Sequence, residues 1–234
     1  MRGYVFKLLV SAALVFVAFS DGHAASVLSS TSVVNWTGFY IGAHVGFGQG
    51  PATITDTTTA NGSLTTTDKG FLGGGQIGYN RQLGSVVLGV EGDISAANID
   101  GSTAIRDANG DVSTSNPKLR WASLVTGRFG YAMDRALLYV KGGVAFAGFN
   151  YSATDITNGG VARANVDRVG AAVGGGIEYA LSPSWSARAE YDYLNFASRN
   201  FSIADPTGAV GQLALKQQLH QAKFGVNYHL GSSQ

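Results

Sequence analysis

Acidic and basic side chains recur at every second position of several apolar segments. The pattern is clearest in two short runs, Glu91 with Asp93, and Arg188 with Glu190 and Asp192. Successive side chains of a β-strand point to opposite faces, so each run places its charges on one face and its apolar residues on the other. Carboxylates and cations that share a face can form ion pairs, or they can line a path for ions or protons.

Eight segments of this alternating kind follow one another along the chain. They are residues 36–49, 70–80, 85–95, 118–133, 137–150, 168–181, 185–196 and 219–230. Tilted strands that cross a membrane need about 9–11 residues, whereas a globular strand has about 5–6, so these lengths favour membrane strands. Aromatic residues lie at both ends of the apolar faces, as in the two interfacial girdles of a transmembrane barrel.

Long polar connections alternate with tight turns between these segments. The long connections are residues 50–69, 96–117, 151–167 and 197–218, and the turns are residues 81–84, 134–136 and 182–184. Outer-membrane barrels have short periplasmic turns and long extracellular loops, and they close because lipid cannot satisfy an open sheet edge. The sequence therefore predicts an all-β fold, an eight-stranded antiparallel up-and-down transmembrane β-barrel over residues 35–230, with both termini in the periplasm.

The N-terminal segment has the features of an export signal. Arg2 and Lys7 precede the apolar run 8–19, and Gly22-His23-Ala24 has the small first and third residues of a cleavage site. The run is much shorter than the about 20 residues of a membrane helix. We predict a cleaved signal peptide over residues 1–24, a periplasmic lead-in over 25–34 and a C-terminal tail over 231–234. The predicted location is the outer membrane of a Gram-negative cell.

Charge and cysteine content exclude several classes of function. Without residues 1–24, the count of Lys and Arg falls from 16 to 14 and that of Asp and Glu from 15 to 14. The exported chain is then neutral, which argues against nucleic acid as a partner because such proteins carry a basic patch. Cysteine is absent, so neither disulfides nor thiolate metal sites are available.

The charged residues on the inward faces are predicted to fill the barrel. An eight-stranded barrel is narrow, and unpaired charges inside it would be costly, so we expect an ion-pair network. Its predicted members are Glu91, Asp93, Arg120, Arg128, Lys141, Glu178, Arg188, Glu190, Asp192 and Lys223. A gated path for ions or protons is the alternative interpretation of the same residues.

The histidines offer an alternative site. His44 is predicted to point inward and His220 to lie near the outer rim, on strands that become neighbours when the barrel closes. With Tyr193 or a loop residue they could ligate heme iron, since His and Tyr both serve as axial ligands. The simpler interpretation is polar lumen and rim residues, with no cofactor and no metal. The histidines lack the outward parity that a lipid-modifying barrel needs, so we expect no enzyme.

Several short motifs resemble those of a known family. They include Asn-Trp-Thr-Gly-Phe-Tyr-Ile-Gly (35–42), Gly-Gly-Gly-Gln-Ile-Gly-Tyr-Asn (73–80) and Ala-Glu-Tyr-Asp-Tyr (189–193). In pattern and order the chain resembles small α-proteobacterial outer-membrane proteins of the porin-family, OmpA-type-barrel group, over about residues 35–230. That group includes surface antigens and hemin-binding members. The resemblance implies an integral outer-membrane protein without implying one activity.

The C-terminal segment also resembles an assembly signal. Lys223, Gly225, Tyr228 and Leu230 match the β-signal by which the barrel-assembly machinery recognises its clients. The family usually ends at an aromatic residue, whereas here Leu230 takes that place and residues 231–234 follow. The expected partners are therefore outer-membrane lipid and the assembly machinery.

The sequence predicts a structural protein that stabilises the outer membrane and presents surface loops. A narrow porin-like channel for small solutes is the first alternative. Binding of hemin or of a host ligand through the extracellular loops is the second.

Overall fold

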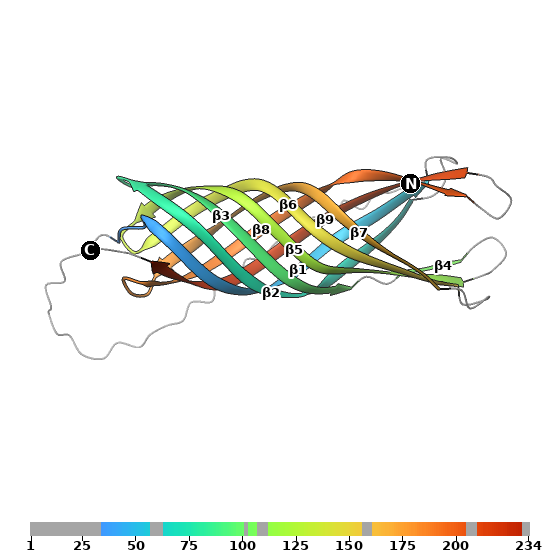
Figure 1. Ribbon diagram of the computed structural model, residues 1–234, viewed down its shortest axis with the longest axis horizontal. Coiled ribbons are helices and arrows are strands. Elements are labelled where there is room, and N and C mark those ends of the chain that lie inside the picture. The colour runs from blue at the N-terminus through green and yellow to red at the C-terminus, as the bar shows by residue number, and fades with distance from the viewer. Residues whose placement is uncertain are drawn as a thin grey trace, which may run out of the picture. The chain divides into compact units, whose positions relative to one another are not determined.

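In the computed structural model, the strands of the protein form a closed antiparallel barrel (Figure 1). The structure describes residues 34–56, 63–100, 103–106, 112–155, 161–204 and 210–230. The strands are β1 (Gly38–Asp56), β2 (Ser63–Leu83), β3 (Val86–Asp100), β4 (Thr103–Arg106), β5 (Val112–Met133), β6 (Ala136–Asp155), β7 (Val161–Ala180), β8 (Trp185–Ala204) and β9 (Val210–Leu230). Within these residues, no helix is long and apolar enough to cross a membrane.

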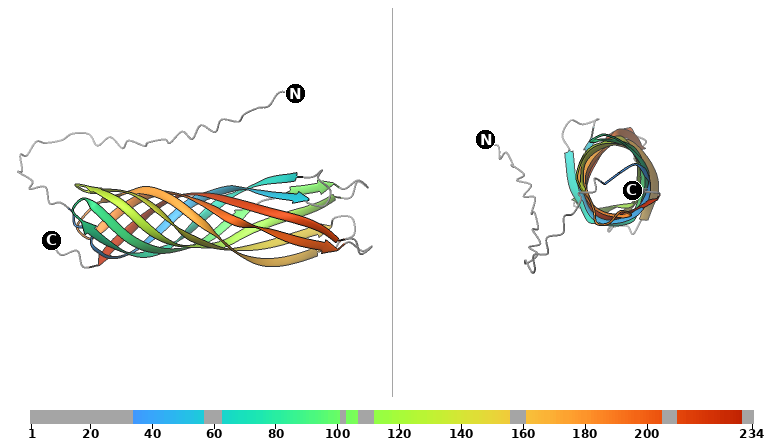
Figure 2. Two further views of the ribbon diagram at one scale, coloured as in Figure 1. Left: turned by 90° about the horizontal axis from the view of Figure 1, so that it is seen from above. Right: turned by 90° about the vertical axis from the view of Figure 1, so that its left-hand side faces the viewer.

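Eight strand positions make up the wall. Consecutive strands pair antiparallel, and β1 also pairs with β9, which closes the ring seen end-on in Figure 2. Both β3 and the short β4 pair with β5, so β4 continues the third wall position and adds no ninth. The predicted eight-stranded all-β barrel is therefore confirmed.

The strands extend much further than the apolar alternation indicates. Residues assigned to the first long connection pair with each other, from Gly50 with Asp68 to Thr55 with Ser63. Much of the predicted loops 96–117, 151–167 and 197–218 is likewise strand. The loop prediction is wrong there because backbone pairing between neighbouring strands continues beyond the apolar alternation on which the prediction rested. In the first extension Thr, which favours strands, is the commonest residue.

The short turns connect the strands at one end of the barrel (Figure 1). Gly84 and Asp134 begin two-residue turns and have positive φ angles of 63° and 47°. Hairpin turns of this length need a positive φ, which Gly adopts freely and Asp tolerates. Because periplasmic turns are the short ones in such barrels, this end is assigned to the periplasm.

The outer wall is apolar between two aromatic levels. Exposed aliphatic residues cover it, including Ile41, Val45, Val90, Val125, Val140, Val173 and Val226. Phe39, Phe129, Tyr131, Tyr179, Trp185 and Tyr228 face outward near the turns, and Phe47, Phe71, Trp121 and Phe146 do so toward the other end. Cross-strand ring contacts stabilise both levels, with centroids 5.1 Å apart for Trp185 and Tyr228 near the turns and 5.7 Å apart for Phe47 and Phe71 at the other level. Two girdles around an apolar band are the outer surface of a membrane barrel.

Candidate functional site

Nine of the ten residues predicted for the ion-pair network are buried inside the barrel. They are Glu91, Asp93, Arg128, Lys141, Glu178, Arg188, Glu190, Asp192 and Lys223. Strand register brings them together, since Arg128 pairs with Lys141, and Glu190 lies opposite Lys223 on the next strand. We call this set, with the tyrosines described below, the charged layer.

Glu91 and Glu190 each contact three cations and one tyrosine hydroxyl. Glu91 Oε2 accepts from Arg188 Nη1 at 2.5 Å and from Arg128 Nη1 at 3.4 Å. Lys141 Nζ lies 3.2 Å from Oε1, and the Tyr40 hydroxyl donates to Oε2 at 2.7 Å. One carboxylate therefore compensates three buried cations from three different strands.

A second cluster forms around the two lysines. Lys141 Nζ lies 2.7 Å from Glu190 Oε1, and Lys223 Nζ lies 2.6 Å from Asp192 Oδ2. Both ammonium groups also approach Asp93 Oδ2, at 3.6 and 3.5 Å. Because Lys141 and Glu190 also contact members of the first cluster, the charges form one network across the lumen.

Glu178 anchors the network toward the short turns. Arg128 Nη2 donates to its Oε2 at 2.9 Å. Its Oε1 accepts from Ser186 Oγ at 2.6 Å and from Asn227 Nδ2 at 2.7 Å, and His229 Nε2 lies 3.5 Å away. The hydroxyl of Ser186 and the amide of Asn227 thus satisfy the oxygen that the arginine does not reach.

Two buried tyrosines belong to the charged layer although the sequence interpretation selected only charged residues. The Tyr139 hydroxyl donates to Glu190 Oε2 at 2.7 Å, and the Arg128 guanidinium lies 3.9 Å from the Tyr139 ring centroid. Tyr40 occupies space that opens because Gly78 has no side chain, since a Cβ there would collide with the Tyr40 ring. In the sequence, both tyrosines have the same parity as the inward residues of their strands, and this parity could have identified them as members of the layer.

The prediction for Arg120 is wrong. The pairing of β5 with β6 shifts register between Leu119 and Trp121, so a β-bulge reverses the parity at this point. Arg120 consequently points out of the barrel and is exposed, while Leu119 is buried in the lumen.

A second layer of the lumen is apolar. It lies beyond the charged layer, because on each strand that contributes to both layers its residues are further from the short turns than the charged ones. Its members are Leu72, Ile99, Leu119, Leu124, Ala145, Ala147, Phe149, Ala172, Leu194, Phe196 and Leu219. Phe149 and Phe196 meet edge to face, with ring centroids 5.8 Å apart. The expectation that charges alone fill the barrel is therefore corrected, and we call this set the apolar layer.

The two candidate heme ligands lie on opposite faces of the wall. His44 is buried in the lumen, with Nδ1 2.7 Å from Gln76 Oε1 and Nε2 2.7 Å from Ser95 Oγ. His220 is half-buried on the outer side, where its Nδ1 lies 2.6 Å from the hydroxyl of the exposed Tyr191. These two histidines do not form a shared heme site.

The residues of the predicted assembly signal lie on β9, the strand that closes the barrel against β1. Tyr228 and Leu230 face outward, whereas Lys223 belongs to the charged layer. The predicted signal peptide (1–24) and the C-terminal tail (231–234) lie outside the described residues, as does all but residue 34 of the lead-in (25–34).

The closed wall, the apolar outer band and the lumen packed with a charged and an apolar layer define an outer-membrane β-barrel. The chain belongs to the family of the outer membrane protein beta-barrel domain, whose sequence model matches residues 11–229. It is 32% identical over 217 residues to the 31 kDa outer-membrane immunogenic protein of Brucella melitensis, covering 88% of each chain. It is 31% identical over 171 residues to a 22 kDa outer membrane protein of Rhizobium leguminosarum, covering 72% of this chain and 68% of that one.

These relatives confirm the resemblance to small α-proteobacterial outer-membrane proteins and the location in the outer membrane. Among solved structures, OprG of Pseudomonas aeruginosa is similar with a TM-score of 0.50 and 14% identity, covering 84% of this chain and 99% of that chain. At that identity the likeness concerns the fold alone.

Proposed function

We propose that the protein is a structural barrel of the outer membrane that is closed to solutes and presents its extended hairpins at the cell surface. The observation that carries the proposal is the double filling of the lumen. The charged layer and the apolar layer lie in series along the barrel, and the side chains of both are almost completely buried.

Each layer opposes passage by a different physical mechanism. In the charged layer, a passing ion or a chain of water molecules would have to separate contacts such as the 2.5 Å pair of Arg188 with Glu91. Breaking one buried ion pair costs about 3–5 kcal/mol. In the apolar layer, Phe149, Leu194 and Phe196 offer no group that could replace the hydration of a passing ion. A solute would have to overcome both barriers.

The strand extensions support the role in surface presentation. β6 continues to Asp155, well beyond the girdle residue Phe146, and its hairpin partner β7 begins at Val161. At about 3.3 Å per residue and a tilt of about 40°, this hairpin rises roughly 20 Å above the outer girdle. A paired hairpin of that height holds the outer ends of its two strands clear of the membrane surface. The Brucella melitensis relative is named as an immunogenic protein, which fits the same arrangement.

Single-channel recording in a planar bilayer tests the proposal. The protein is refolded in detergent, and its folding is verified by the difference in gel migration between heated and unheated samples. We expect no discrete conductance steps from the folded protein. Steps from the unmodified protein would overturn the closed-barrel assignment and favour the porin-like alternative.

A gated channel and a doubly closed barrel respond differently to opening one layer. If the charged layer alone were a gate, Lys141→Ala or Arg128→Ala would raise the conductance. In a doubly closed barrel, Lys141→Ala remains silent because the apolar layer still closes the lumen. Conductance should then require the combined variant Lys141→Ala with Phe196→Ala and Leu194→Ala.

The hemin alternative has a separate test. Because His44 and His220 form no common site, a Soret shift on adding hemin should be absent, or should persist unchanged in His44→Ala and His220→Ala. A shift that either substitution abolishes would restore the hemin-binding alternative.

A further inference from the structure

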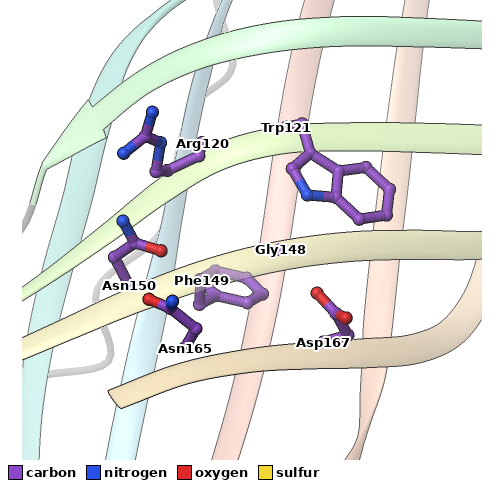
Figure 3. Close-up of a pocket in the computed structure, with 7 residues that line it drawn as sticks. All are labelled: Arg120, Trp121, Gly148, Phe149, Asn150, Asn165 and Asp167. Carbon is purple, nitrogen blue, oxygen red and sulfur yellow. The ribbon is translucent and has the colours of Figure 1, made fainter. Parts of the chain in front are cut away.

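A recess of about 320 Å³ opens on the outer wall of the barrel, where β5, β6 and β7 lie side by side. Figure 3 shows the residues that line it, Arg120, Trp121, Gly148, Phe149, Asn150, Asn165 and Asp167. Of these, Phe149 points into the barrel and belongs to the apolar layer. The remaining side chains face outward.

The β-bulge in β5 forms one side of this recess. It turns Arg120 outward beside Trp121, and the Trp121 indole occupies the space beside Gly148 on the next strand. A Cβ at position 148 would collide with the indole ring, so Gly148 is needed for this placement. Asn150 pairs with Asn165 across β6 and β7, which adds two amide groups to the same surface.

The polar lining distinguishes the recess from the apolar wall beneath it. Within the described part of the chain, Arg120 and Asp167 form neither an ion pair nor a side-chain hydrogen bond. A guanidinium, a carboxylate and two amides thus converge with their bonding capacity unused. Surface charges can remain hydrated, but a concave site that combines them with an indole wall is suited to a polar ligand.

The position of the recess identifies the source of that ligand. Trp121 belongs to the outer aromatic girdle, and such girdles mark the level of the lipid headgroups. Directly below the pair of Gly148 with Asp167, the outward residues Phe146 and Val169 continue into the apolar band. A molecule in the recess would therefore have its apolar part along the wall and its polar part among Arg120 and the two asparagines.

We propose that this recess binds the headgroup of the phosphorylated glycolipid of the outer leaflet, lipopolysaccharide. The Arg120 guanidinium matches a phosphate through two parallel N–H donors. The Trp121 ring packs against a sugar ring, and Asn150, Asn165 and Asp167 bond its hydroxyl and amide groups. Asp167 repels the phosphate, which orients the headgroup with its phosphate at the Arg120 end of the recess.

Binding of purified diphosphoryl lipid A to the refolded full-length protein tests the proposal, with native mass spectrometry in detergent as the readout. Arg120→Gln should weaken binding about tenfold, because it removes a charge-assisted hydrogen-bond pair. The matched control is Lys69→Gln, which removes one positive charge from the outward side of β2, two residues above the girdle residue Phe71. That control should change affinity by less than about twofold.

A second matched pair separates the indole from general girdle effects. Trp121→Leu should weaken lipid A binding several-fold, whereas Phe71→Leu at the same level of β2 should not. All four positions are exposed, and each variant is checked for heat-modifiable gel migration before binding is measured.

Three results would overturn the proposal. The first is no binding of lipid A, or an equal loss in Arg120→Gln and Lys69→Gln. The second is equally tight binding of soluble glucosamine 1-phosphate, which would indicate a free sugar phosphate as the ligand. The third is equal, Arg120-dependent binding of phosphatidylglycerol, which would indicate any anionic lipid. None of these outcomes depends on whether the lumen conducts.

Discussion

The charged layer and the apolar layer both consist of inward-facing side chains of the barrel strands, yet they fill the lumen with different kinds of contact. Glu91 is fixed by directional contacts with Arg188, Lys141 and Tyr40. Leu194, the next inward residue of β8 after Asp192, is held by packing in the apolar layer. The lumen does not face lipid, so it can be filled either by ion pairs or by apolar packing, whereas the outer wall must be apolar. Substitutions in the two layers should therefore lower the free energy of unfolding by different amounts and with different dependence on salt.

Glu91→Gln should have the largest effect. The variant keeps the size of the side chain but leaves Arg128, Lys141 and Arg188 without their common carboxylate. Removing one partner of a buried ion network costs about 3–5 kcal/mol. Urea unfolding of the protein in detergent micelles should show this loss in the free energy of unfolding. A loss below 1 kcal/mol would mean that water enters the charged layer and screens it.

Leu194→Ala tests the apolar layer in the same assay. Leu194 is completely buried, and deleting such a side chain costs about 2–5 kcal/mol, depending on how far the surroundings relax. We expect about 3 kcal/mol, independent of salt concentration. Leu138→Ala on the exposed face of β6 is the control and should change stability less, because the detergent replaces its contacts. An equal loss in both variants would argue against a packed apolar layer.

Asp68→Asn tests the effect of a buried carboxyl group at the outer boundary of the apolar layer. Asp68 lies beyond the outer girdle beside Ile99, Phe149 and Leu219. Burial, with the nearby Asp100 adding to it, raises the pKa of Asp68 to about 6. The folded protein therefore holds this proton more tightly than the unfolded chain, and stability falls as the pH rises from about 4 to about 6, by about 2 kcal/mol.

The asparagine variant should lose this pH dependence and be more stable than the unmodified protein at pH 7. Unfolding curves at pH 4, 5, 6 and 7 measure both effects. Asp100→Asn serves as the control, because it removes the nearby exposed charge while leaving the burial of Asp68 unchanged. A pH profile that is identical in Asp68→Asn and the unmodified protein would assign the titration to another group.

The strand pattern of the sequence predicts the barrel and the charged layer because side-chain alternation is a strictly local property. It predicts Arg120 wrongly because a β-bulge shifts the parity, and no local residue type marks that bulge. Leu124, Leu194 and Leu219 share the parity of the inward charges in the sequence, but parity alone does not show that they gather in a separate apolar layer. That layer forms from contacts across the lumen between strands that are distant in the chain.

Tyr139→Phe should have a smaller effect within the charged layer. It removes one hydroxyl, which donates to Glu190 Oε2 at 2.7 Å. Glu190 retains Lys141 and Lys223 as partners, so no charge is left alone. We expect a loss of about 1.5 kcal/mol, the lower end for a hydrogen bond to a charged group. A loss as large as that of Glu91→Gln would show that the tyrosine, and not the ion pairs, organises this layer.

The smallest effect is expected for the ion pair outside the lumen. Lys118 Nζ lies 3.2 Å from Asp100 Oδ1, and the two side chains are 53% and 46% exposed. The pair has the geometry of the contacts in the charged layer, but water surrounds it, and such pairs contribute about 0–1 kcal/mol. Lys118→Gln should therefore change the free energy of unfolding by less than 1 kcal/mol, and less still in 1 M salt, where exposed charges are screened. A loss comparable to that of Glu91→Gln would mean that burial is not what separates the charged layer from the surface pair.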